Sequence, residues 1–238
     1  MKSVKSDVVT RLPRTYSDLI RHMAAEQWQK RAETNYSPLM PNQLRGILSD
    51  STPSQIDDLK AMVVEELTVM QKILIGDELD QVRDFWNDMG IPHAENRCRD
   101  RLAAMVGPAL APYGIQRITE ADMPQTKRAD LAFSAGDMQL PMEVKGQWHD
   151  DVWNAATDQL DARYLIDWRS EQRGIYCVLW FGDLPSASRR RLKVPPSKFP
   201  FPTSAGEMQR LLVQTIPEAR RHRIDVIVLD LTAGRPNQ

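Results

Sequence analysis

An uninterrupted apolar run constrains the fold more than any other segment of the chain. It comprises Gly174-Ile175-Tyr176-Cys177-Val178-Leu179-Trp180-Phe181, with Gly182 directly after it. A run of this length without alternating polar residues is typical of a β-strand that is covered on both faces. The sequence therefore predicts an α/β protein in which helices flank a central sheet.

The segments around this run predict a fixed order of helices and strands. Apolar spacings of three and four indicate helices, and shorter apolar or period-two runs indicate strands. Pro217 should kink or restart the last helix. The expected order is helix 93–110, strands 114–119, 127–134 and 138–146, helix 151–167, strand 174–181, helix 204–222 and strand 224–231.

The first ninety residues predict a helical extension. A short helix is expected over 17–31, followed by a proline-containing loop over 35–41. Thr52, Pro53 and Gln55 form a helix-start pattern, because a threonine cap is followed by proline at the first helical position and glutamine two residues later. Apolar residues then recur at helical spacing up to Gly76, and a second helical piece is expected over 78–89. We expect residues 1–90 to serve packing, a dimer or a partner, and residues 91–238 to form the functional domain.

Composition and charge restrict the class of protein. The apolar fraction of 42% and the charged fraction of 26% are those of a globular domain. A formal net charge of -1 argues against coating nucleic acid by bulk electrostatics, although it leaves a local basic surface open. Cys98 and Cys177 lie on apolar faces and are expected to be buried thiols. No apolar segment long enough for a signal peptide or membrane span is present, so a cytoplasmic protein is expected.

Charged residues interrupt the predicted strand 138–146. Because side chains alternate across a strand, Glu143 and Lys145 share one face and Met142 and Val144 share the other. Asp130, on the preceding strand, can reach the same place. Two carboxylates and a lysine suit the binding of a divalent metal beside a phosphate.

Glu95 is a further candidate, since it lies on the same helix face as Cys98, one turn nearer the start. A carboxylate aligned with an apolar stripe needs a partner, which can be a cation, a metal or backbone donors. The alternative is a first-turn glutamate that complements the helix dipole.

These residues and the order of the elements resemble the restriction-endonuclease-like superfamily, the PD-(D/E)XK nucleases. The resemblance covers about Ile91 to Leu231, and its motif residues match Asp130 and Glu143-Val144-Lys145, with Glu95 as the added helix glutamate. Ala129 stands where the family name has a proline. The resemblance implies a restriction-endonuclease-like core of the order α-β-β-β-α-β-α-β, with a mixed central sheet.

The resemblance also implies a site. Lys145 would orient or deprotonate the attacking water and stabilise the phosphate, and Gln159 resembles a glutamine that many of these nucleases place near the metal or the scissile phosphate. The cofactor would be Mg²⁺, with Mn²⁺ able to substitute. Its ligands would be Asp130, Glu143, the main-chain carbonyl of Val144, and Glu95 for a second metal or a metal-bound water.

The function implied is that of a metal-dependent endonuclease that hydrolyses DNA, of the kind that serves as the effector of bacterial defence systems and works as a dimer or in a larger assembly. Arg128 would contact phosphate or pair with a carboxylate. The basic loop is expected either to follow the DNA backbone or to be simply solvated, and contains Arg189, Arg190, Arg191 and Lys193. Two alternatives are a catalytically silent nucleic-acid-binding or scaffolding module and an RNA-cleaving toxin.

Overall fold

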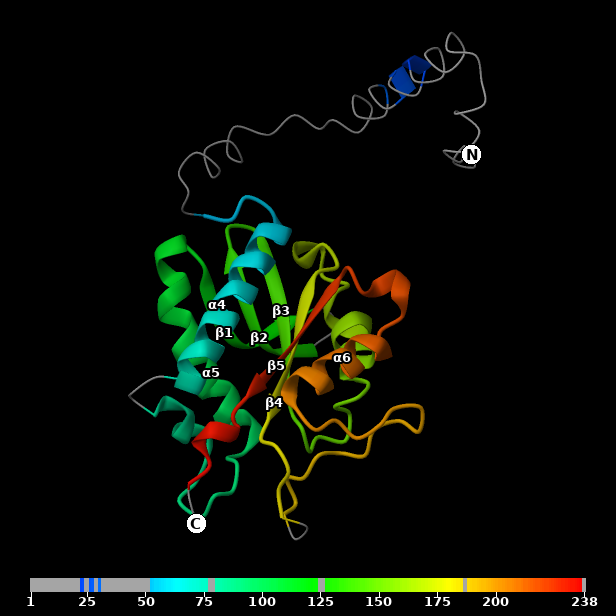
Figure 1. Cartoon of the computed structure of the whole chain (residues 1–238). Coiled ribbons are helices and arrows are strands. Elements are labelled where there is room, and N and C mark those ends of the chain that lie inside the picture. The colour runs from blue at the N-terminus through cyan, green and yellow to red at the C-terminus, as the bar shows by residue number, and fades with distance from the viewer. Residues whose placement is uncertain are drawn as a thin grey trace. The chain divides into compact units, whose positions relative to one another are not determined.

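The fold is described by a computed structural model of the 238-residue chain (Figure 1). It describes residues 22–23, 26–27, 30, 52–76, 80–123, 127–185 and 188–236. The chain divides into two compact units, Met1–Pro41 and Asn42–Gln238. In the first unit the described residues are helical and fall within the helix expected over 17–31. The loop expected over 35–41 lies outside the described residues.

The second unit is built on a mixed sheet. Among the described residues, five strands pair in the order β1-β2-β3-β4-β5. The pairs β1–β2 and β2–β3 are antiparallel, whereas β3–β4 and β4–β5 are parallel. The predicted α/β class is therefore confirmed. The strands are β1 Gln116–Met123, β2 Lys127–Ala135, β3 Met138–Gly146, β4 Gly174–Trp180 and β5 Ile224–Asp230.

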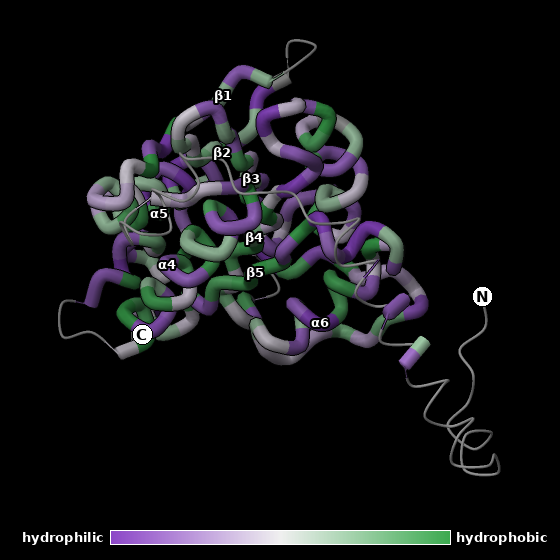
Figure 2. The backbone as a smooth tube through the Cα atoms, turned by 90° about the horizontal axis from the view of Figure 1, so that it is seen from above, coloured by the Kyte–Doolittle hydropathy of each residue, from purple (hydrophilic) through white to green (hydrophobic). Residues whose placement is uncertain are grey.

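Helices cover both faces of this sheet, as the apolar run in β4 predicts. Every residue of β4 is buried, and its side chains alternate between two apolar clusters. Cys177 belongs to the cluster with helices α4 and α5, and Val178 to the cluster with η4 and α6. Figure 2 shows the apolar β4 and β5 in the middle of the unit, between these helices. The helices are α4 Ile56–Gly76, α5 Glu95–Leu110, η4 Ala156–Tyr164 and α6 Ala205–Thr215.

Helix α4 is part of the sheet domain. Its predicted stripe is buried in the same cluster as β3 and β4, and consists of Ile56, Leu59, Val63, Leu67, Met70 and Leu74. The boundary expected between residues 90 and 91 therefore falls inside the second compact unit.

The start of α4 differs from the prediction. The helix begins at Ile56, and it is Ser54 whose hydroxyl and backbone N–H donate to the Asp58 carboxylate, at 2.6 and 3.2 Å. The Gln55 carbonyl accepts the first intrahelical hydrogen bond, from the Leu59 N–H at 3.1 Å, so Gln55 and not Thr52 is at the cap position.

Two other helices also differ from the expected form. Within 78–89, the residues described from 80 onward form only the short 3₁₀ helix η1, Gln81–Phe85. The helix expected over 151–167 is instead a π-helix, η4, preceded by turns. Its inward residues Trp153, Leu160 and Tyr164 are buried as predicted. Periodicity placed these side chains correctly but could not distinguish a π-helix from an α-helix.

The last predicted helix is shorter than expected. Helix α6 ends at Thr215, and after Pro217 the chain restarts as the 3₁₀ turn η6, Glu218–Arg220. The expected interruption at the proline is confirmed. None of the helices in the described ranges is both long and apolar enough to cross a membrane.

The burial of α4 leads to a stability prediction. Replacing Leu67 by Ala should lower the free energy of unfolding of the sheet domain by about 2–5 kcal/mol, because the side chain is fully buried. The neighbouring Val69→Ala is the control and should change it by less than about 0.5 kcal/mol, since Val69 is 40% exposed. Urea unfolding followed by far-UV circular dichroism measures both. Equal stabilities of the two variants would mean that α4 is not part of this core.

Candidate functional site

The site begins where β2 and β3 stop pairing. Their antiparallel register runs from Ala135 to Leu131, which pairs with Met142, and goes no further. The next free amide of β3, the Val144 N–H, donates to the Asp130 carboxylate at 2.9 Å. Because the N–H and C=O of one strand residue face the same neighbouring strand, the Val144 carbonyl also faces the side of Asp130.

A second carboxylate completes this edge of β3. The Gly146 N–H donates to Glu95 Oε2 at 2.7 Å, so the first turn of α5 is bound to the end of β3. The predicted need of Glu95 for a partner is therefore met by a backbone donor. Gly146 itself has to be small, since a Cβ there would lie 2.6 Å from the Trp148 ring.

Lys145 lies at the centre of three carboxylates. Its Nζ is 2.6 Å from Glu143 Oε1, 3.6 Å from Asp130 Oδ2 and 3.7 Å from Glu95 Oε1. The Glu143 and Lys145 side chains are only 2% and 7% exposed, whereas those of Asp130 and Glu95 are 24% and 25% exposed. The predicted four residues are thus brought together, with one buried ion pair beneath two carboxylates that solvent can reach.

Negative charge is in excess in this cluster. Three carboxylates surround one ammonium, and the nearest further cation is Arg99, whose Nη1 is 3.8 Å from Asp130 Oδ1. Burial, followed by the charge of Asp130, raises the pKa of Glu143 to about 7. Burial by itself would lower the pKa of Lys145, but the neighbouring Glu143 and Asp130 carboxylates outweigh it and raise this pKa above its usual range. Glu143 and Lys145 therefore both stay protonated to a higher pH than such groups usually do.

The donor set fits a hard divalent cation. One oxygen of Glu143, Oε2, is buried without a hydrogen-bond partner within the described residues. Carboxylate and carbonyl oxygens are what Mg²⁺ prefers, and it is often held by only one or two carboxylates together with water and phosphate. In the parts of the chain that the structure describes, no three His, Cys, Asp or Glu side chains form a ready-made metal cage. Asp130, Glu143 and the Val144 carbonyl could hold the ion, with Glu95 beside them.

Gln159 is not part of this cluster. It lies on η4 and its Nε2 donates to Asp151 Oδ2 at 3.0 Å. Gln159 is therefore bonded to Asp151 and not to the cluster, and its role near the phosphate stays a prediction.

The predicted DNA-binding cations lie in different surroundings. Arg128 is exposed and pairs with Asp122 at 3.2 Å and Glu120 at 3.7 Å, which is the carboxylate pairing left open by the sequence. Arg190 donates to the His93 carbonyl at 2.5 Å and stacks over the Trp148 ring, 4.8 Å from its centroid. These contacts give the two arginines structural roles.

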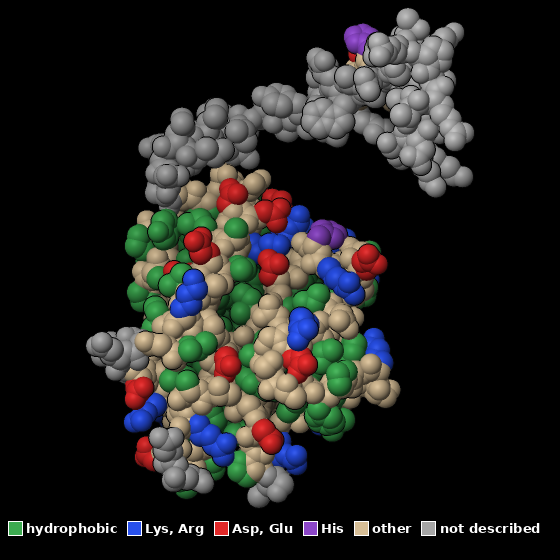
Figure 3. Space-filling view, in the orientation of Figure 1, with side chains coloured by type: hydrophobic (Ala, Val, Ile, Leu, Met, Phe, Trp, Pro, Cys, Tyr) green, Lys and Arg blue, Asp and Glu red, His purple; other side chains and the backbone are tan. Residues whose placement is uncertain are grey.

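The rest of the basic loop is nearer to solvent. Lys193 forms an ion pair with Asp150, while Arg189 and Arg191 are exposed. On the face seen in Figure 3, acidic and basic side chains alternate without forming one continuous basic area. Any basic surface for nucleic acid is therefore local on this face.

Two residues of the site region were not predicted. Arg99 lies four residues after Glu95 on α5 and pairs with Asp130, so the helical spacing of the two could have signalled it. Gln147 is fully buried; its Oε1 accepts from the Phe181 N–H at 2.7 Å and its Nε2 donates to the Gly182 carbonyl at 3.0 Å. Gln147 thus links the end of β3 to the end of β4. A single glutamine after a strand carries no sequence signal for this role.

Comparison with known proteins gives one match. A family model described as Domain of unknown function (DUF8371) matches residues 60–183, slightly more than half of the chain. The matched segment includes Glu95, Asp130, Glu143 and Lys145. No curated protein and no solved structure matches the chain.

The raised pKa of Glu143 predicts a pH dependence of stability in the metal-free protein. A carboxyl group whose pKa rises from 4.5 unfolded to about 7 folded is favoured when protonated, so its contribution is full below pH 4.5 and is lost as the pH rises to 7. The loss should approach about 3 kcal/mol. We expect Glu143→Gln, which cannot ionise, to remove this loss. Urea unfolding in EDTA between pH 4.5 and 8 measures the difference, and parallel pH profiles for the two proteins would contradict it.

Proposed function

The chain belongs to the DUF8371 family, a domain of unknown function, and we propose that it is a metal-dependent endonuclease that hydrolyses phosphodiester bonds in DNA. One observation carries the proposal, namely the convergence of Asp130, Glu143 and Glu95 on the Lys145 ammonium. Such a group of oxygen ligands beside a buried cation suits a metal ion and a phosphate together.

The order of the elements supports a restriction-endonuclease-like core. Helix α5, strands β1 to β3, η4, β4, α6 and β5 follow the order expected of that superfamily. The two motif strands are neighbours, and where β2 departs from β3 the Asp130 carboxylate accepts a hydrogen bond from the Val144 N–H, between the two other motif residues of β3. One centre per chain would cut one strand, so a double-strand break would use two copies.

The residues would act on a bound metal and phosphate as follows. Asp130, Glu143 and the Val144 carbonyl would hold Mg²⁺ or Mn²⁺, and Glu95 would hold a metal-bound water. When bound, the ion would supply a water of lowered pKa and neutralise charge that develops on the phosphate. Arg99 would keep the Asp130 carboxylate oriented through its contact with Oδ1.

Lys145 would orient the attacking water and stabilise the phosphate. In the metal-free protein the Glu143 and Asp130 carboxylates raise the pKa of Lys145, so its ammonium can donate hydrogen bonds to a phosphate oxygen or to that water. Deprotonation of the water by Lys145 stays the alternative role.

A second candidate is a catalytically silent nucleic-acid-binding or scaffolding module. The observation that favours it is the position of Lys145, which already fills the space between the three carboxylates as a structural cation. Metal titration separates the two functions, because binding to the folded state alone raises the melting temperature. Mg²⁺ or Mn²⁺ should stabilise a nuclease and leave a silent module unchanged.

Three single substitutions test the nuclease directly. Asp130→Asn, Glu143→Gln and Lys145→Ala should each lower the rate of Mn²⁺-dependent DNA cleavage at least about 100-fold, because each removes a ligand or the cation at the phosphate. Cleavage of plasmid, single-stranded DNA and RNA by equal amounts of protein is measured on gels. Circular dichroism checks that each variant is folded.

Asp122→Asn is the matched control. Asp122 lies on the adjacent strand β1, is 88% exposed and pairs only with Arg128 in the described residues, so this variant should retain full activity. Full metal-dependent cleavage by Glu143→Gln or Lys145→Ala would rule out this centre. Cleavage of RNA alone would instead favour the RNA-cleaving toxin.

A further inference from the structure

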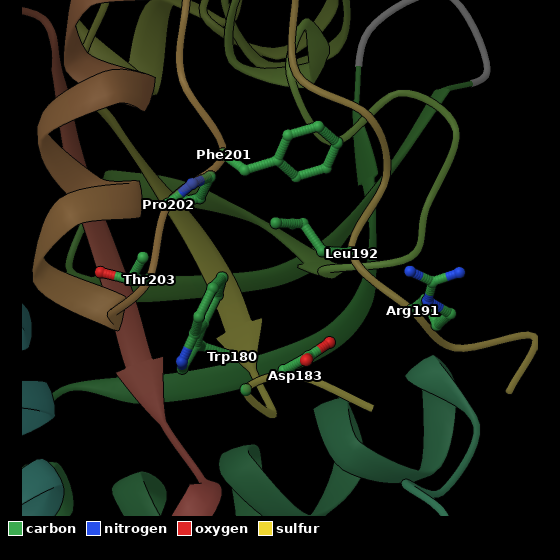
Figure 4. Close-up of a pocket in the computed structure, with 8 residues that line it drawn as sticks. Trp180, Asp183, Arg191, Leu192, Phe201, Pro202 and Thr203 are labelled. Carbon is green, nitrogen blue, oxygen red and sulfur yellow. The ribbon is translucent and has the colours of Figure 1, made fainter. Parts of the chain in front are cut away.

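A pocket opens at the C-terminal end of β4. Its volume is about 350 Å³, which is within the range of small-molecule sites. Trp180 lines it from the end of the strand, and Leu192 and Phe201 line it from the loop that follows (Figure 4). Asp183 and Arg191 add two charged side chains to the lining.

The pocket lies on the same face of the sheet as Lys145. In the parallel pair β3–β4, Lys145 is level with Val178, and Trp180 is two residues further along that face. With strands about 4.8 Å apart and a rise of about 3.3 Å per residue, the Cα atoms of Lys145 and Trp180 are roughly 8 Å apart. One residue of the cluster and one of the pocket lining therefore lie on neighbouring strands near the carboxyl ends of the parallel pair, where α/β proteins bind ligands.

The lining combines an open aromatic ring with unused polar groups. The Phe201 side chain is 58% exposed. Within the described ranges, the Asp183 carboxylate and the Arg191 guanidinium have no hydrogen bond or ion pair; only the Asp183 main-chain oxygen is engaged, by Arg235. By contrast, the Thr203 hydroxyl donates to Glu207 at 2.7 Å. Among the described residues, the charged side chains of the lining that a ligand could bind are thus one carboxylate and one guanidinium.

We propose that this pocket binds one unstacked base of a single-stranded segment of the substrate, next to the phosphate at the carboxylate cluster. Phe201 would stack on the base, because every base has an aromatic face. Arg191 would contact an adjacent phosphate. This inference rests on the proposed function, since it names the form of nucleic acid that the same centre takes.

The Asp183 carboxylate gives the pocket a preference among bases. A carboxylate only accepts hydrogen bonds, so it fits the N4 amino group of cytosine. Thymine offers it a single N3–H between the O2 and O4 acceptors, both of which the carboxylate repels. The pocket therefore selects bases that carry an amino group over thymine. An asparagine at this position could also donate, and would remove the preference.

Binding of oligonucleotides in EDTA tests the pocket without cleavage. Fluorescence anisotropy with labelled ten-residue oligo-dC and oligo-dT should show at least about fivefold tighter binding of oligo-dC by the intact protein. Phe201→Ala should weaken binding of oligo-dC about tenfold or more, the equivalent of one lost base stack. Asp183→Asn should bring the two affinities together.

Trp168→Ala is the control, because it removes an aromatic side chain that is also exposed but lies outside the pocket. It should leave both affinities unchanged. Equal binding of oligo-dC and oligo-dT, no binding of either, or normal binding by Phe201→Ala would each overturn the proposal. The cleavage assay separates this outcome from failure of the nuclease, since metal-dependent cleavage with no base preference would reject the pocket alone, and base-selective binding without cleavage would reject the nuclease alone.

Discussion

The buried ion pair between Lys145 and Glu143 is the interaction on which the rest of the site depends. A single charged side chain in that position would be prohibitively costly to bury, and the pair is tolerable because the two groups are 2.6 Å apart. The ammonium also reaches Asp130 and Glu95, so one cation holds side chains from β2, β3 and α5 in one place. Removing it would leave three carboxylates without their common partner.

The position of β3 in the sheet explains why such a cluster forms there. This strand is antiparallel to β2 and parallel to β4, and it stays paired with β4 to its end. On its other side the ladder ends at Met142, which leaves the amides of Val144 and Gly146 without strand partners. The Asp130 and Glu95 carboxylates accept hydrogen bonds from these two amides, so the backbone N–H groups are satisfied. Asp130 and Glu95 thus serve both as acceptors for unpaired amides of β3 and as members of the carboxylate cluster.

Much of the fold follows from apolar spacing, because spacing decides which side chains can be buried together. The apolar run in β4, the stripe of α4 and the inward residues of η4 all lie where spacing predicts. Spacing does not report local hydrogen bonding, so it missed the start of α4 at Ile56 and the π-helical form of η4. It also could not show that α4 packs on the sheet, since an apolar stripe does not identify its partner.

The site, in turn, was predictable in its members but not in its contacts. Strand alternation places Glu143 and Lys145 on one face, whereas the contact of Arg99 with Asp130 depends on a helix-to-strand distance that tertiary packing sets.

The charge balance of the cluster is difficult to explain by stability alone. An apolar replacement of a buried ion pair is often neutral or stabilising, so the pair is weak support for a purely structural role. The two more accessible carboxylates do not need Lys145 for solvation, and their presence raises the negative charge next to a buried glutamate whose pKa is already raised to about 7. A divalent cation would reverse that imbalance and engage the unpartnered Glu143 Oε2. The excess of carboxylates that raises the pKa of Glu143 is therefore the feature that a bound metal ion would stabilise.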